Sequence, residues 1–206
     1  DHNMWDDTML MVVTDHGFLL GEHDWWGKMC MPWYNETAHI PLFIWDPRLG
    51  VKGERRTSLT QTIDLGPSIL EFFDVDIPKD MMGTPLRQVM EDDTPHHEAA
   101  LFGMFGGHVN VTDGRYIYMR APEPGNSPLN HYTLMPSHLR RPFSTEELKD
   151  MAWHEPLSFS KNCPVMRIPS NGPVGRTPEL FETRLFDIEN DPDQTQPLND
   201  PVVEQE

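Results

Sequence analysis

The most constraining feature of the sequence is a short apolar run that ends in an acidic and a basic side chain. Residues 9–13 (MLMVV) are consecutive apolar residues, and Thr14, Asp15, His16 and Gly17 follow them. The run is too short for an isolated helix and does not alternate with polar residues, so we expect a strand buried on both faces, as in a parallel sheet. Gly17 lets the chain turn sharply after the strand. Ligands and metals collect at this edge of open α/β sheets, which makes it the first candidate site.

Two side-chain types at this edge suit cation binding. Asp15 offers a carboxylate oxygen and His16 an imidazole nitrogen, and one cation can accept both. Lys28 follows 13 residues after Asp15, next to Gly27, and could return to the same edge as a fixed positive charge. The alternatives are that Asp15 and His16 form only a hydrogen-bonded turn, and that Lys28 is an ordinary surface lysine.

Several further sequence blocks follow in order. They are residues 20–23 (LGEH), 26–28 (WGK), 41–44 (PLFI), 64–70 (DLGPSIL), 112–118 (TDGRYIY) and 184–192 (RLFDIENDP). Together with residues 14–17 (TDHG), these blocks resemble the carboxyl-terminal half of the sulfatase family, within the alkaline-phosphatase-like superfamily. A single Asp-His-Gly would be a weak signal, and the order of several blocks makes it specific.

The resemblance implies an α/β fold, with part of a mostly parallel sheet flanked by helices and then a small carboxyl-terminal antiparallel sheet. We expect residues 1–95 to be the carboxyl-terminal part of the α/β catalytic domain. Residues 96–206 are expected to form a small antiparallel-sheet subdomain with a long loop and a polar tail. Its long loop is the proline-rich span 121–178, in which Ser144 begins a capped helix.

The resemblance also implies an activity, the hydrolysis of sulfate monoesters by a metal-dependent sulfatase. Asp15 and His16 would be metal ligands, Lys28 a catalytic and substrate-binding residue on the sulfate oxygens, and His23 a second substrate-binding residue. The implied cation is calcium first, with manganese or magnesium as alternatives. A hard cation takes about 6 to 8 ligands, so the resemblance places the others on a missing amino-terminal half of the same protein.

The nucleophile of the family is a formylglycine made from the Cys or Ser of Cys/Ser-x-Pro-x-Arg. Residues 30–34 (CMPWY) lack the arginine, and residues 163–167 (CPVMR) place the proline one position early. We therefore expect the formylglycine on an upstream segment and expect this chain alone to be nearly inactive.

Two other functions stay open at the level of sequence. The Asp-His-Gly and Gly-Lys elements do not separate sulfur from phosphorus, so a phosphonate monoester or phosphodiester hydrolase of the same superfamily is an alternative. A non-catalytic binding module is the other.

His96 and His97 form an adjacent pair next to Glu98. Neighbouring side chains project in different directions in a helix or a strand, so we expect this pair to be exposed and not to form a metal site.

Charge and hydropathy exclude two kinds of partner. The chain has 16 Lys and Arg against 33 Asp and Glu, a formal charge of −17, which disfavours nucleic acid and anionic lipid. No apolar run approaches the roughly 20 residues that cross a membrane. Because a sulfate ester is itself an anion, a bound cation and Lys28 would have to invert the field locally.

Without the remaining strands of the sheet, a strand edge and an apolar face would be exposed. We therefore expect the chain to self-associate or to bind the missing half of the protein.

Overall fold

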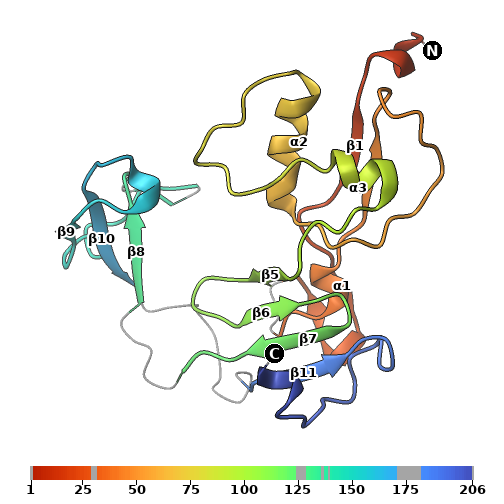
Figure 1. Ribbon diagram of the computed structural model, residues 1–206. Helices are drawn as coiled ribbons and strands as arrows, with labels where there is room; N and C mark the ends of the chain where they lie inside the picture. Colours follow the sequence, from red (N-terminus) through yellow and green to blue (C-terminus); the bar gives the residue numbers. More distant parts are fainter. Residues whose placement is uncertain are drawn as a thin grey trace. The chain divides into compact units, whose positions relative to one another are not determined.

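The computed structural model describes residues 2–28, 32–123, 129–135, 137, 138, 140–170 and 182–205. As far as it is described, the chain forms two compact units, one from residues 2–103, 108–121 and 182–205 and the other from residues 104–107 and 122–170 (Figure 1). No helix among the described residues is long and apolar enough to cross a membrane. The boundary that we place between residues 95 and 96 follows the change of sheet type and stays a prediction.

The first strand of the larger unit lies in a two-stranded sheet. β1 (Leu10–Val13) pairs antiparallel with β4 (Leu42–Trp45). The prediction that β1 is parallel and buried on both faces is wrong for the described chain, because Leu10 and Val12 are 44% and 53% exposed. β4 is its single partner among the described residues, so most of its apolar surface is left uncovered.

A small hairpin and one helical turn connect these two strands. β2 (Leu19–Leu20) and β3 (Trp26–Gly27) pair antiparallel around the 3-10 helix η2 (Glu22–Asp24). α1 (Asn35–Ala38) then leads into β4. Leu19 is fully buried and anchors the hairpin.

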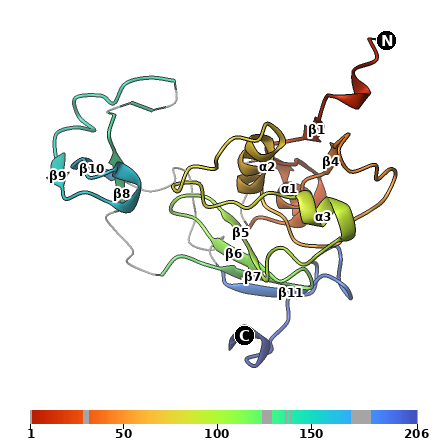
Figure 2. The same cartoon turned by 45° about the horizontal axis from the view of Figure 1, so that its top comes forward.

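Two helices follow β4. α2 (Leu65–Phe72) continues from the 3-10 helix η3 (Thr62–Asp64), and α3 (Arg87–Asp92) comes after a proline- and glycine-containing link. Arg48, just after β4, donates a hydrogen bond of 3.1 Å to the Glu71 carbonyl oxygen in α2. This bond ties α2 to the end of β4. Both elements belong to the larger unit (Figure 2).

The carboxyl-terminal part of the larger unit is the predicted small antiparallel sheet. Its strands lie in the order β11-β7-β6-β5, and all neighbours are antiparallel. The bounds are β5 (Ala100–Gly103), β6 (Val109–Thr112), β7 (Tyr116–Arg120) and β11 (Arg184–Asp187). The buried His108, just before β6, donates from Nε2 to the carbonyl oxygen of Glu182 at 3.0 Å, which joins distant parts of the chain.

The hydrophobic core of this sheet also includes Tyr34, the residue just before α1. Tyr34, Ile117, Met119 and Phe186 are buried together, and each buried side chain of this kind contributes roughly 1.5 to 3 kcal/mol. Arg184 donates to the Tyr34 hydroxyl oxygen at 2.7 Å. The segment before α1 is therefore fixed to the last strand of the chain.

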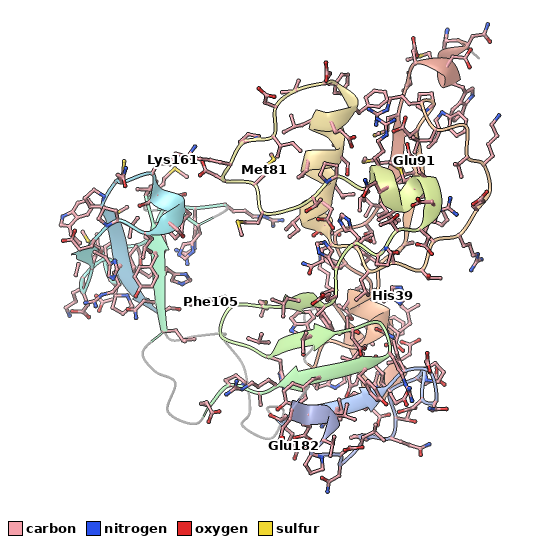
Figure 3. The ribbon with its side chains drawn as sticks, in the orientation of Figure 1. His39, Met81, Glu91, Phe105, Lys161 and Glu182 are labelled. Atoms are coloured by element: carbon pink, nitrogen blue, oxygen red, sulfur yellow. The ribbon has the colours of Figure 1, made fainter. Side chains whose placement is uncertain are left out.

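The smaller unit contains a second sheet where we expected a long loop. β8 (Leu129–Thr133), β9 (Ala152–His154) and β10 (Val165–Ser170) form an antiparallel sheet in the order β8-β10-β9. Phe105 packs against His131 of β8 with ring centroids 4.9 Å apart (Figure 3). The predicted loop is thus wrong for its described part, while residues 124–128, 136, 139 and 171–178 lie outside the described residues.

The helix that we expected from Ser144 is also wrong. Residues 145–150 form turns, although the backbone N–H and hydroxyl of Ser144 each donate to Glu147 at 2.8 Å. Glu147 also accepts hydrogen bonds from Arg141 and His138. Its carboxylate therefore holds a compact turn and does not begin a helix. Further 3-10 helices among the described residues are η1 (Met4–Asp6), η4 (Ser158–Ser160) and η6 (Val203–Gln205).

Candidate functional site

Asp15 and His16 lie in the turn that follows β1, and we call them the strand-end pair. The Thr14 hydroxyl donates to the His16 carbonyl oxygen at 3.1 Å, and the His16 N–H donates to Asp15 Oδ1 at 3.1 Å. The turn brings Asp15 Oδ2 to 3.3 Å from His16 Nε2. The two atom types that we proposed as metal ligands therefore face the same small volume.

Gly17 fixes where this turn can lie. Its N–H donates to the Thr37 carbonyl oxygen at 2.9 Å, and a Cβ atom here would lie 1.7 Å from the Glu36 carbonyl oxygen. A side chain at position 17 would therefore overlap the backbone of α1. The close approach requires glycine, and it holds the strand-end pair against α1.

The strand-end pair is open to solvent. The side chain of Asp15 is 83% exposed and that of His16 is 32% exposed. Slight desolvation raises the pKa of Asp15, but His16 and the backbone N–H bonds outweigh it and lower the pKa below its ordinary value. Asp15 is thus an ionised carboxylate at neutral pH. An oxygen and a nitrogen so close together fit two neighbouring positions around one cation, with space for further ligands from elsewhere.

His23 lies inside a group of protein side chains. Its ring stacks on Tyr34 with centroids 3.5 Å apart and planes at 7°, and its Nε2 is 3.6 Å from Glu36 Oε2. The side chain is 10% exposed, and its backbone has a φ of 54°, which non-glycine residues rarely adopt. The structure therefore places His23 against α1, where it is packed by the protein.

Lys28 follows β3 directly and is exposed. Among the residues that the structure describes, no hydrogen bond or ion pair joins Lys28 to Asp15 or His16. The structure thus brings Asp15 and His16 together and leaves Lys28 unattached to them. The metal, substrate and catalytic roles of Asp15, His16, His23 and Lys28 stay predictions.

A second group of side chains was missed by the sequence analysis, and we call it the histidine cluster: Asp64, His96 and His97. His97 Nε2 lies 2.9 Å and His96 Nε2 3.4 Å from Asp64 Oδ2. The expectation that both histidines are exposed is wrong, since their side chains are 7% and 21% exposed for His96 and His97.

The physical reason is that residues 93–97 are neither helix nor strand, so the two side chains are not forced to opposite directions. Pro95, which directly precedes the pair, was the local signal for an irregular backbone.

Asp64 is held in this cluster by backbone groups. Its carboxylate accepts the N–H of Gln61 at 2.8 Å and the N–H of Thr84 at 3.0 Å. Burial raises the pKa of Asp64, but these bonds and the one from His97 hold the pKa below its ordinary value. The carboxylate is therefore fixed in position, fully buried and ionised.

Comparison with solved structures identifies related folds. The chain superposes on a solved protein in complex with its substrate, D-glucosamine-2-N,6-O-disulfate, with a TM-score of 0.58 and 17% sequence identity. The match covers 96% of this chain and 31% of the solved chain. The chain therefore shares the α/β fold of that solved protein and corresponds to a part of it.

The sequence comparisons then show which family this chain resembles. Residues 21–114 match the model of the N-sulphoglucosamine sulphohydrolase carboxyl-terminal family. The N-acetylglucosamine-6-O-sulfatase of Bacteroides thetaiotaomicron is 34% identical over 88 residues, which are 43% of this chain and 15% of that protein. The resemblance of this chain to the carboxyl-terminal part of the sulfatase family is confirmed.

A relative with a broader name also matches. The multifunctional alkaline phosphatase superfamily protein PehA of Trinickia caryophylli is 33% identical over 93 residues, 44% of this chain and 18% of that protein. The chain therefore spans less than one fifth of the length of either of these relatives.

Proposed function

We propose that this chain is a part of a metal-dependent sulfuric ester hydrolase, to which it contributes metal ligands and a sulfate-binding lysine. The observation that carries the proposal is the strand-end pair, whose Asp15 Oδ2 and His16 Nε2 lie 3.3 Å apart in a chain similar to sulfatases. A divalent cation held by a carboxylate and an imidazole would supply the local positive charge that binding of an anionic ester needs.

Asp15 and His16 would hold a divalent cation, with calcium expected first and manganese or magnesium as alternatives. When bound, such a cation polarises the ester and stabilises negative charge that develops on the leaving oxygen. The exposed Asp15 carboxylate leaves positions for the other ligands, which we propose come from a segment outside this chain.

Lys28 would supply the second positive charge. It lies at the end of the β2–β3 hairpin, and its exposed ammonium is free to meet a bound anion. Preorganised positive charge near the sulfate oxygens lowers the barrier to breaking the ester bond. His23, packed on Tyr34, would orient the hairpin that carries Lys28 and reach the substrate from beside α1.

The nucleophile is proposed to lie outside this chain, as a formylglycine. The same outside segment would provide further, mostly parallel strands beside the sheet of β1 and β4. Apolar side chains on both strands support this, since Val12 and Phe43 are 53% and 67% exposed. Large exposed apolar patches of this kind mark surfaces that another protein segment covers.

The test uses the parent protein that contains this chain, purified with its bound metal. We expect hydrolysis of 4-nitrophenyl sulfate, and we expect Asp15→Asn and His16→Gln to lose bound metal together with activity. Lys28→Ala should keep the metal and lower kcat/KM by roughly 100-fold to 1,000-fold, the usual effect of removing one stabilising donor. The control is Lys79→Ala, another exposed lysine, which should match the parent. Normal activity of the Lys28 variant would refute its role.

The match to PehA, a multifunctional protein of the alkaline phosphatase superfamily, supports a second candidate function. Phosphonate monoesters and phosphodiesters are also anions, and the same strand-end pair and lysine suit them. The same variants assayed with 4-nitrophenyl phenylphosphonate and bis(4-nitrophenyl) phosphate decide between the two. Faster hydrolysis of these substrates than of the sulfate ester would favour the second function. If no ester is cleaved and no metal is bound, a non-catalytic binding module is the better account.

The chain by itself should be nearly inactive and should associate through its exposed apolar strands. We expect light scattering to show dimers or larger species for the isolated chain, and we expect association to decrease when Val12 and Phe43 are both changed to Lys. A monodisperse monomer before substitution would contradict this part of the proposal.

A further inference from the structure

The histidine cluster has the composition of a transition-metal site and is not used by the proposed sulfatase chemistry. Asp64 comes from η3 at the start of α2, and both histidines come from the segment that leads into β5. One ligand atom from each of the three side chains lies within 4.8 Å of the others. The fold thus gathers two imidazoles and one carboxylate from positions 33 residues apart.

An independent observation is that His96 has an unpartnered, buried nitrogen. Its side chain is 93% buried, since 7% is exposed, and Nε2 has no hydrogen-bond partner among the described residues. This nitrogen points toward Asp64 Oδ2 at 3.4 Å, too far for a good hydrogen bond after Asp64 has accepted bonds from Gln61 and His97. A buried polar atom without a partner is destabilising, and a bound cation would supply the missing partner.

The distances from the two histidines to the carboxylate are close to those around a tetrahedral ion. Zn–N bonds of about 2.0–2.1 Å and Zn–O bonds of about 2.0–2.2 Å place neighbouring ligand atoms about 3.3–3.5 Å apart. His96 Nε2 already lies at 3.4 Å from Asp64 Oδ2, and His97 Nε2 at 2.9 Å would need to move by a few tenths of an ångström. The ring centroids of His96 and His97 are 4.3 Å apart, and the ring planes meet at 68°. The rings are therefore not stacked, and each can direct a nitrogen toward a common centre.

Backbone groups that are not ligands orient the Asp64 carboxylate, as is usual for metal ligands in proteins. The N–H of Thr84 binds Oδ1 and the N–H of Gln61 binds Oδ2, which fixes the plane of the Asp64 carboxylate. Imidazole nitrogen favours Zn²⁺ and similar ions over Ca²⁺ and Mg²⁺, which prefer oxygen.

We propose that Asp64, His96 and His97 bind one Zn²⁺ ion, with water as the fourth ligand. The bound ion joins the start of α2 to the segment before β5 and so has a structural effect. This inference does not depend on the sulfatase proposal, because it uses none of Asp15, His16 or Lys28.

The test uses the full chain in an Asp15→Asn, His16→Gln background, so that the strand-end pair cannot contribute. Zn²⁺ affinity is measured by competition with a chromophoric chelator, and Co²⁺ is added separately as a spectroscopic probe. We expect one Zn²⁺ per chain, the intense visible bands of tetrahedral Co²⁺, and a higher melting temperature with Zn²⁺.

Two variants remove one ligand each, His96→Gln and His97→Gln. We expect each to weaken Zn²⁺ binding by at least about 100-fold, more than the loss of an outer hydrogen bond does, and to abolish the tetrahedral Co²⁺ bands. The control is His39→Gln, which removes an exposed histidine after α1 (Figure 3) and should bind like the background.

Circular dichroism without metal checks that the variants fold. If one of the two ligand variants does not fold, the other still tests the proposal. Equal Zn²⁺ affinity in the His96, His97 and His39 variants would overturn the proposal. So would octahedral Co²⁺ spectra, which indicate surface binding. If both ligand variants unfold without metal, Asp64→Glu, which keeps a carboxylate but shifts it by one methylene, replaces them, and unchanged Co²⁺ bands there would equally overturn it.

Discussion

The strand-end pair and the histidine cluster contain the same kinds of side chain in opposite surroundings. Asp15 is 83% exposed and accepts its hydrogen bonds from its own turn. Asp64 is fully buried and accepts bonds from residues 3, 20 and 33 positions away. The first carboxylate is placed by local sequence and the second by the tertiary fold.

This difference separates two ways of building a metal site. The strand-end pair supplies two ligand atoms on an open turn, and a hard cation there needs several more ligands. The histidine cluster supplies three ligand atoms and an orienting shell within one unit of this chain. In our proposals, other segments would complete the first site, whereas the second would bind a tetrahedral ion with ligands from this chain and water.

The largest effect on stability should come from the buried carboxylate. Asp64→Ala leaves the N–H groups of Gln61 and Thr84 and the ring of His97 without their acceptor. We expect a loss of about 3 kcal/mol in the free energy of unfolding, because several buried donors lose their acceptor. Urea denaturation without metal measures it.

The same substitution at the other site is the matched control. Asp15→Ala should change the free energy of unfolding by less than about 0.5 kcal/mol, as is usual for an exposed side chain. Equal losses for the two variants would break the comparison between an open and a buried carboxylate.

A smaller effect should follow from moving the turn that holds the strand-end pair. Gly17→Ala places a Cβ atom on the Glu36 carbonyl oxygen, so the turn or α1 must shift. We expect a loss of about 2 kcal/mol, typical of overpacking, measured by thermal and urea unfolding.

Gly66→Ala serves as the control for this change. A Cβ atom there would lie 3.6 Å from the Met81 side chain, an ordinary contact, and alanine favours the helix over glycine by roughly 0.8 to 1 kcal/mol. The Gly66 variant should be as stable as the parent or more stable. A Gly17 variant that is equally stable would show that the turn is free to move.

The strand-end turn and the histidine cluster also differ in how well the sequence predicts them. The apolar run 9–13 and the break at Gly17 place β1 and its turn correctly, because both signals are local. The burial of β1 was predicted wrongly, since burial depends on neighbouring strands, and β4 is its partner in the described chain. The histidine cluster depends on contacts across 33 residues, which no local pattern encodes.

The sheet of the smaller unit shows a second limit of sequence patterns. β10 contains Pro169, and proline within an apolar run argues against a strand. β8 has the sequence LNHYT, in which no alternation of polar and apolar residues is evident. These strands form because β10 can pair on both sides and bury Val165 and Ile168, a tertiary effect that overrides weak local preference.

Removing the hydrogen bond between Tyr34, just before α1, and Arg184 of β11 should lower the free energy of unfolding by about 1 kcal/mol. Tyr34→Phe removes the hydroxyl that accepts a hydrogen bond from Arg184 and keeps the ring that stacks on His23. A typical lost hydrogen bond costs about 1 kcal/mol, and the Arg184 side chain, which is 27% exposed, can bind water in place of the hydroxyl. Urea denaturation measures it, with Tyr132→Phe in the smaller unit as the control that should change nothing. A loss above about 3 kcal/mol would mean that the hydroxyl does more than bind Arg184.

The last prediction concerns Asp187, a carboxylate that pairs with Arg115 and belongs to neither proposed metal site. Hydrogen bonds from Arg115, together with one from Asn190, lower the pKa of Asp187 to about 2 against the effect of burial, from an ordinary value of 3.8. A carboxyl group with a lowered pKa in the folded state stabilises the fold fully above the unfolded pKa and loses this contribution as the pH falls.

The stability difference between the parent and Asp187→Asn should therefore be constant from neutral pH down to about 4 and then shrink toward pH 2. Thermal unfolding across this pH range measures it, with Asp76→Asn, at an exposed position after α2, as the control that shows little difference at any pH. A difference that stays constant down to pH 2 would mean that Arg115 does not hold the ionised form. In that case burial and charge pairing, which distinguish Asp64 and Asp187 from Asp15, would not be what fixes these carboxylates.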